Sequence, residues 1–179
     1  MKLNYLTYQT FPASTANSLQ TITHIKYFSK KNIDVCLVFP LREKESSQSL
    51  KEIQSFYEFD EEFRIQALPH KLPFGRVKKG IKLSYLFSHL FWSYLTVKKV
   101  LKEKDGQNFI TRSDWIFYFL SRKGQKVIFE CHQVTKMRKY LVKKSLKNPS
   151  SSLICLTSYI LKDLGIETKE YSDRIKIIP

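Results

Sequence analysis

The stretch KLNYLTYQTFPASTANSLQTITHIKYFSKKNIDVCLVF, residues 2–39, decides the fold class because it joins two strand patterns through one helix pattern. Residues 2–8 predict a strand, and residues 33–39 form a near-continuous apolar run typical of a strand buried on both faces. Residues 17–31 predict a helix, because apolar side chains recur at every third position. These side chains are Leu19, Ile22, Ile25 and Phe28. The order indicates two parallel strands joined by a right-handed crossover.

The same alternation of strand and helix patterns continues through the rest of the chain. Further strands are predicted at residues 63–68, 108–111, 126–131, 152–157 and 174–179. Further helices are predicted at residues 50–57, 81–104, 113–124, 136–147 and 158–165. Ser113 is the expected N-cap of one of these helices and Gly124 its C-terminal stop. We therefore expect an α/β fold, a Rossmann-like doubly wound, mostly parallel sheet with helices on both faces.

Prolines and turn-forming residues mark the expected breaks between these elements. Pro40 and Pro69 follow two of the apolar runs and are expected to end those strands, because proline cannot donate a backbone hydrogen bond. Residues 69–75, PHKLPFG, are rich in turn formers and indicate a connection rather than a domain boundary. The 179 residues are therefore expected to form one domain.

The cysteines and the longest apolar segment exclude some classes of protein. Cys36, Cys131 and Cys155 are widely spaced and lie inside apolar runs, which favours reduced core thiols over a disulfide framework or a zinc site. Residues 83–97, LSYLFSHLFWSYLTV, fall short of the ~20 apolar residues that span a bilayer. We expect the aromatic side chains of this segment to pack into the core.

The positive charge is concentrated in one part of the chain. Residues 1–70 hold 8 basic and 8 acidic residues, whereas residues 71–179 hold 23 basic and 8 acidic residues and supply the whole net charge of +15. Such an asymmetry indicates an anionic partner, which could be a membrane surface, a nucleic acid or a phosphorylated ligand. A lysine-rich solvated surface explains the same charge without any partner.

Ligands of parallel α/β sheets gather where strands turn into helices, and the first such place is the loop at residues 11–17. Asn17 and Gln20 fit a capping box that begins the helix at Asn17 or Ser18, and the positive helix end favours a phosphate. Ser14 and Thr15 could add donors, as could Asn17. The glycine motifs of dinucleotide-binding and Walker loops are absent, and a capped helix without a ligand stays open.

Three more strand ends carry candidate residues. Glu130 and His132 leave one predicted strand on the same face, because side chains alternate along a strand. A carboxylate and an imidazole there favour a binding or catalytic role over a structural pair. Arg112 follows another strand and could bind an anion through its planar guanidinium, although a surface ion pair explains it equally well. Ser158 lies at a fourth strand end.

The other three histidines are expected to be structural. His24 lies within a predicted helix, His70 in a predicted turn and His89 in the aromatic segment. The sequence contains no cluster of metal-ligating residues, so no metal site is expected.

Five segments follow one another along the chain: FPASTANSLQTITHIKYFSKKNIDVCLVFP, ITRS, VIFECHQ, LICLTSYILKDLGI and DRIKIIP. Together they resemble the N-terminal domain of GT-B glycosyltransferases of the retaining family 4. FPASTANSLQTITHIKYFSKKNIDVCLVFP resembles that family's first loop, helix and "GHEVTLI"-like strand, with TANS in place of the commoner Gly-Gly. ITRS resembles the family's Y-x-R-S segment, and VIFECHQ resembles its V-x-E-x-H segment. LICLTSYILKDLGI and DRIKIIP resemble the segments that close the domain. The resemblance covers nearly the whole chain.

The resemblance implies that residues 1–179 are the acceptor-binding half of a GT-B fold. A second Rossmann domain, which would bind the nucleotide sugar, is then missing from this sequence, and we expect no transfer by this chain alone. The implied reaction moves a sugar with retention from a nucleotide-diphosphate sugar to a saccharide or lipid-linked acceptor of the cell envelope. It implies no cofactor and no metal.

The resemblance also implies roles for individual residues. His132 would be the catalytic residue that faces the reacting sugar, while Arg112, Glu130 and Ser158 would bind substrate on the acceptor side. The first loop would supply four further substrate-binding residues, Ser14, Thr15, Ala16 and Asn17.

The alternative function is a non-enzymatic basic module that binds an anionic membrane or a nucleic acid. No nucleic-acid motif is recognisable, and we expect no nucleic-acid partner. For the transferase we expect a cytoplasmic protein that can associate with the inner face of the cell membrane.

Overall fold

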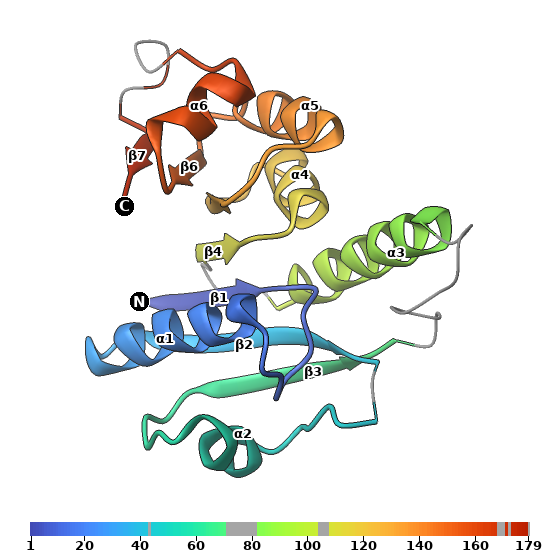
Figure 1. The fold of residues 1–179 in the computed structure, drawn as a ribbon, viewed down its shortest axis with the longest axis vertical. Helices are drawn as coiled ribbons and strands as arrows, with labels where there is room; N and C mark the ends of the chain where they lie inside the picture. Colours follow the sequence, from blue (N-terminus) through green and yellow to red (C-terminus); the bar gives the residue numbers. More distant parts are fainter. Residues whose placement is uncertain (43, 71–81, 104–107, 168–170, 172, 179) are drawn as a thin grey trace. The chain divides into compact units, whose positions relative to one another are not determined.

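A computed structural model of the chain describes residues 1–42, 44–70, 82–103, 108–167, 171 and 173–178 (Figure 1). The chain divides into two compact units, Met1–Gln107 and Asn108–Pro179. Each unit is an alternation of parallel strands and helices. The expected connection at residues 69–75 lies outside the described residues from Lys71 onward, and Pro179 also lies outside them.

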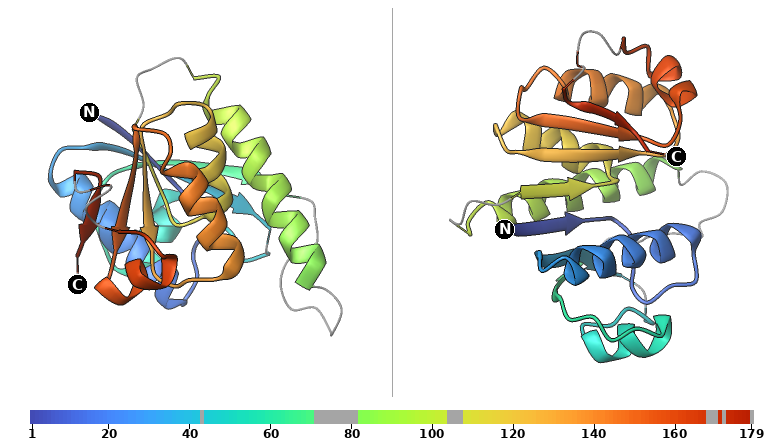
Figure 2. Two further views of the ribbon diagram at one scale, coloured as in Figure 1. Left: turned by 90° about the horizontal axis from the view of Figure 1, so that it is seen from above. Right: turned by 90° about the vertical axis from the view of Figure 1, so that its left-hand side faces the viewer.

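Three strands and three helices lie in the described residues of the first unit. They are β1 (Lys2–Leu6), α1 (Ala16–Lys30), β2 (Asp34–Leu41), α2 (Leu50–Tyr57), β3 (Arg64–Pro69) and α3 (Lys82–Val100). The strands lie in the order β3-β2-β1, and both pairings are parallel, with Leu3 opposite Val35 and Leu37 opposite Ile65. Figure 2 shows α1 and α3 on opposite faces of these strands.

The buried face of α1 differs in part from the sequence expectation. Ile22 and Ile25 are buried as expected, whereas Leu19 is 49% exposed. The inner face is completed instead by Ser18 and Thr21, which are buried. Small hydroxyl side chains allow a helix to lie close to a sheet, so the contacting face turns toward them and away from Leu19.

The end of β2 also differs from the expectation, because the strand continues through Pro40 to Leu41. The Val38 carbonyl accepts a hydrogen bond from the Thr7 N–H at 3.0 Å, so residues 38 and 40 both direct their backbone groups toward the β1 side. The register with β1 ends at Val38, and on the other side Pro40 lies opposite Leu68. The missing N–H of Pro40 therefore interrupts no pairing with β1.

The part of the second unit that the structure describes has four parallel strands in the order β4-β5-β6-β7. Its elements are β4 (Asn108–Thr111), α4 (Asp114–Arg122), β5 (Val127–Cys131), α5 (Lys136–Ser145), β6 (Ser151–Cys155), α6 (Ser158–Leu164) and β7 (Ile175–Ile177). Phe117 of α4 stacks on Phe129 of β5, with ring centroids 5.0 Å apart. Ser113 caps α4 as predicted, and Gly124 follows its end with a φ of 69°, a backbone conformation that favours glycine.

The fold class expected from the sequence is confirmed as α/β, Rossmann-like and doubly wound.

The expectation that the aromatic side chains of the segment 83–97 pack into the core is wrong for several of them. Phe87, Phe91 and Tyr94 of α3 are at least half exposed. In the described part of the chain, no helix is long and apolar enough to cross a membrane.

The three cysteines are buried free thiols, as expected. Cys131 and Cys155 are register partners on β5 and β6. A hydrogen bond with Cys155 lowers the pKa of the Cys131 thiol, and the same bond together with burial raises the pKa of Cys155.

Candidate functional site

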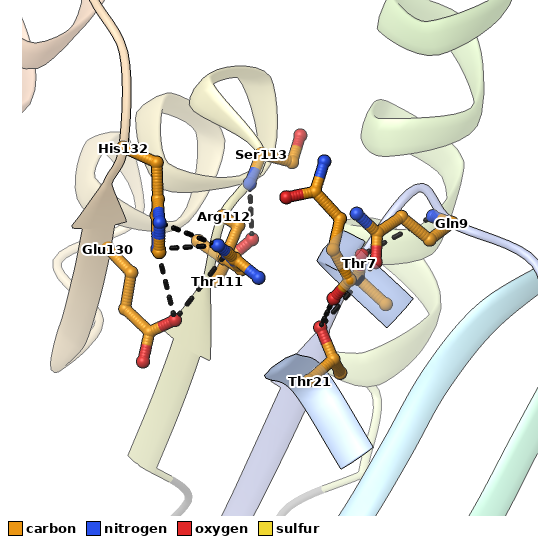
Figure 3. A network of polar contacts seen from close by, with 9 residues as sticks. Thr7, Gln9, Thr21, Thr111, Arg112, Ser113, Glu130 and His132 are labelled. Carbon is orange, nitrogen blue, oxygen red and sulfur yellow. Dashed lines mark hydrogen bonds and ion pairs between the residues drawn. The ribbon is translucent and has the colours of Figure 1, made fainter. Parts of the chain in front are cut away.

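The clearest polar cluster of the second unit lies at the carboxyl ends of β4 and β5. Arg112 directly follows β4, Glu130 lies in β5 and His132 directly follows β5. Figure 3 shows the three side chains converging, with Arg112 reaching His132 and Glu130. Arg112 Nη2 lies 2.7 Å from His132 Nδ1 and 2.6 Å from Nε2, and Arg112 Nε lies 3.7 Å from Glu130 Oε2.

The alternation of side chains along β5 explains this convergence. Phe129 turns to the face that α4 covers, where it stacks on Phe117. Glu130 and His132 then share the opposite face, as the sequence predicts, and His132 Nε2 lies 4.0 Å from Glu130 Oε2. Arg112 is brought to the same place because the parallel strands β4 and β5 end side by side.

The contact between Arg112 and His132 occupies the hydrogen-bond acceptor of the imidazole. A guanidinium group has only donors, so a ring nitrogen of His132 must accept the hydrogen bond. The cluster thus combines a guanidinium, a carboxylate and an imidazole ring whose accepting nitrogen faces Arg112.

Burial differs among the three residues. The side chains of Arg112 and Glu130 are each 7% exposed, whereas the His132 side chain is 20% exposed. Removing two charges from water is costly, and their attraction offsets that cost only when the pair is well placed. Arg112 and Glu130 therefore form a buried ion pair. His132 is the most exposed of the three residues, so a ligand can reach it most easily.

Caps hold the two loops that carry these residues. Before α4, the Ser113 N–H donates to Thr111 Oγ1 at 3.0 Å, and Ser113 Oγ accepts from the Ile116 N–H at 3.4 Å. Before α5, Arg138 Nη1 donates to the Gln133 carbonyl at 2.9 Å. These hydrogen bonds hold the backbone next to Arg112 and next to His132 in place.

Among the described residues, no hydrogen bond or ion pair joins Ser158 to this cluster. It is the exposed first residue of α6, directly after the N-cap Thr157, whose hydroxyl accepts from the Ile160 N–H at 3.4 Å. Its expected role in substrate binding stays a prediction.

The loop before α1 belongs to the first unit, and its cap differs from the expected one. The N-cap is Thr15, and α1 begins at Ala16 rather than at Asn17 or Ser18. Thr15 Oγ1 accepts from the Ser18 N–H at 3.2 Å and lies 2.8 Å from Ser18 Oγ. Ser18 thus takes the position that a capping box gives to Glu or Gln.

The four residues expected to bind substrate at this helix start are all exposed: Ser14, Thr15, Ala16 and Asn17. The Tyr57 hydroxyl anchors the loop before them, since it lies 2.8 Å from the Ala13 nitrogen and donates to the Ala13 carbonyl at 2.6 Å. A further polar chain runs from Thr7 through Gln9 to Thr21, as Figure 3 shows. The N-terminus of α1 is therefore an exposed helix end on a fixed loop.

Sequence reasoning missed a second cluster, which lies at the carboxyl ends of the three strands of the first unit. The Tyr8 hydroxyl lies 2.9 Å from both His70 Nε2 and Ser88 Oγ, and these two atoms are 2.8 Å apart. The Arg42 guanidinium lies over the Tyr8 ring, 4.6 Å from its centroid. The His89 ring stacks on Tyr8 at 4.3 Å.

Burial favours the neutral forms of His70 and of the Tyr8 hydroxyl in this second cluster. Burial, together with the Arg42 charge, lowers the pKa of His70 from 6.5 to about 4, so His70 is neutral at neutral pH. Burial also raises the pKa of the Tyr8 hydroxyl. The strand-end rule marks Arg42 and His70 as single candidates, because Arg42 directly follows β2 and His70 directly follows β3, but it does not bring them together.

Comparison with models of known protein families gives no match, and comparison with curated protein sequences gives none. Among the residues that the structure describes, no group of three or more His, Cys, Asp or Glu side chains could hold a metal ion.

Proposed function

We propose that this chain supplies the acceptor-binding side of a GT-B glycosyltransferase, which moves a sugar from a nucleotide sugar to a saccharide or lipid-linked acceptor. The observation that carries the proposal is the convergence of Arg112, Glu130 and His132 at the strand ends of the second unit. These residues lie in ITRS and VIFECHQ, two of the five segments that carry the resemblance to that family.

The chemistry of the cluster suits a sugar. Each sugar hydroxyl both donates and accepts a hydrogen bond, and the cluster offers carboxylate acceptors, guanidinium donors and an imidazole. His132, the most exposed of the three, contacts the reacting sugar in this proposal. Arg112 and Glu130 orient His132 from below, and catalysis then depends mainly on positioning the two substrates.

In the first unit we assign the α1 N-terminus to the donor phosphates or to an anionic group of the acceptor. A helix N-terminus carries free N–H groups and partial positive charge. No glycine precedes α1, so the side chains of Ser14 and Asn17 would supply donors that bare backbone supplies elsewhere. A second domain that binds the nucleotide would complete the reaction, and we expect no turnover by this chain alone.

The proposal is tested by ligand-observed NMR with a panel of disaccharides that contain hexose, N-acetylhexosamine or uronic acid. At least one disaccharide is expected to bind, and His132→Ala is expected to abolish its signal. Gln133→Ala is the matched control, because the Gln133 side chain is exposed beside the site. Arg112→Lys keeps the charge but loses the planar fork and is expected to weaken binding, whereas Arg122→Lys changes an exposed arginine and should not.

Two outcomes count against this function. Equal binding by the His132→Ala variant would place the saccharide elsewhere, and measurable sugar transfer by the purified chain would refute the division of labour between two domains. The cytoplasmic location and the association with the inner face of the membrane belong to the same proposal.

A further inference from the structure

Helix α3 exposes several large apolar side chains to solvent, although other apolar side chains of the same helix are buried. Phe87 is 62% exposed, Phe91 51% and Leu95 44%. The buried face of the same helix includes Ser88, Ser93 and Thr96. The inner face also carries Trp92, Val97 and Val100, so the exposed aromatic side chains form a second apolar face, which an ordinary surface helix does not have.

The exposed apolar residues lie in one line that ends in lysines. We define the α3 stripe as Phe87, Phe91, Tyr94, Leu95 and Lys98, followed by Lys102 just beyond the helix. At 3.6 residues per turn, the helical members fall within an arc of about 100°. The aromatic residues occupy the middle of the helix, and the exposed lysines extend the line at its C-terminal end.

We propose that the α3 stripe docks on the surface of an anionic lipid bilayer. Phe, Tyr and Leu side chains insert at the boundary between headgroups and acyl chains, while lysines at the end of the same face contact anionic headgroups. The helix lies on such a surface rather than crossing it. The inference rests on the proposed function, because it names the surface for the membrane association, but it uses none of the residues of the proposed active site and is tested without sugar binding.

Charge and composition favour a membrane over the other two occupants. A second copy of this chain would bring together two molecules that each carry a net charge of +15, which opposes association at low salt. A nucleic-acid surface interleaves aromatic rings with positive charges along its length. In the α3 stripe the apolar residues come first and the lysines follow, and Leu95 offers no ring for a base to stack on.

The test is co-sedimentation of the chain with vesicles of phosphatidylcholine alone and of an equimolar mixture with phosphatidylglycerol. Strong binding is expected only to the anionic vesicles, and it should weaken as salt is raised. The double variant Phe87→Ser/Phe91→Ser is expected to bind about tenfold or more weakly, because two apolar side chains no longer insert. Lys98→Gln is expected to weaken binding about fivefold.

The matched control is Tyr27→Ser/Phe56→Ser, which removes two comparably exposed aromatic side chains from α1 and α2 of the same unit. This variant is expected to bind vesicles as the parent does. Circular dichroism of both double variants shows whether the fold is kept, which is expected because all four side chains are exposed. Phe91→Trp gives a second readout, since its emission should shift to shorter wavelength only with anionic vesicles.

Several results overturn the inference. It fails if neither vesicle binds, if both double variants lose binding equally, or if phosphatidylcholine alone binds as strongly as the anionic mixture. It also fails if Phe87→Ser/Phe91→Ser changes only the sedimentation coefficient of the free chain, which would indicate a second copy as the occupant. If the variant Phe87→Ser/Phe91→Ser loses binding to single-stranded DNA but keeps its binding to vesicles, the ligand of the α3 stripe is a nucleic acid instead.

Discussion

Replacing Glu130 by glutamine removes the negative charge from a buried ion pair while keeping the shape of the side chain. Arg112 Nε and Glu130 Oε2 are 3.7 Å apart, and each side chain is 7% exposed. With an effective dielectric constant of about 20, the Coulomb attraction at this distance is roughly 4.5 kcal/mol. Removing one partner of a buried pair costs about 3–5 kcal/mol, because the other charge stays buried.

The contact between Arg112 and His132 survives in this variant, so the loss should lie at the lower end of that range. We expect the free energy of unfolding to fall by about 3 kcal/mol, which for a chain of this length lowers Tm by about 6–12 °C. Urea unfolding followed by circular dichroism measures the first quantity, and a thermal scan measures the second. The control is Asp34→Asn, which breaks the exposed Asp34–Arg64 pair at 2.9 Å and should cost less than about 1 kcal/mol.

A third variant separates the buried charge from simple loss of packing. Arg112→Met/Glu130→Leu removes both charges together and should recover most of the stability that Glu130→Gln loses. The reasoning is refuted if Glu130→Gln and Asp34→Asn cost the same, or if the double variant is less stable than Glu130→Gln.

Three further predictions concern stability. Thr15→Ala should lower the free energy of unfolding by about 1 kcal/mol in urea denaturation, because it removes the observed N-cap of α1, whereas Asn17→Ala should cost much less. The pKa of His70 is about 4 in the folded chain and 6.5 as the ordinary value, so the unfolded chain binds a proton first as pH falls. Stability measured in urea should therefore drop between about pH 6.5 and pH 4 and level off below, and His70→Gln should flatten this slope. Gly124→Ala should destabilise the chain by about 1 kcal/mol, because φ is 69°, and Gly124→Asn should cost less since asparagine tolerates this conformation better.

Local sequence signals predicted the order of the elements and several of their boundaries. The strand at residues 108–111 and the helix at residues 50–57 were predicted to the residue, because polar or turn-forming residues bound both apolar patterns. Ser113 and Gly124 act as the predicted helix signals for α4. Such signals lie within a few residues of what they determine, so no knowledge of the tertiary structure is needed.

The orientation of α3 could not be predicted in the same way. Its sequence contains apolar residues on several sides, and the buried face combines Trp92 and Val97 with serine and threonine side chains. Close packing selected the small hydroxyl residues for the inside and left Phe87 and Phe91 exposed. A periodicity analysis that counts only apolar residues favours the opposite face.

The two polar clusters differ in how far they could be predicted from the sequence. Glu130 and His132 could be paired from the sequence, because the period of a single strand places them on one face. The cluster of Tyr8, Arg42 and His70 could not, because these residues follow three strands whose lateral order appears only when the sheet is formed. The neutral state of His70 also depends on burial that the sequence does not display.

The claim that His132 contacts the sugar is tested most directly by NMR of the four histidine rings during titration with the disaccharide that binds. The account predicts that the ring resonances of His132 shift with saturation, because the sugar contacts this imidazole, and that those of His24 on α1 do not move. It also predicts that Arg112→Lys weakens the response of His132 without changing the spectrum of His24. Unchanged His132 resonances in the presence of bound saccharide would contradict the account.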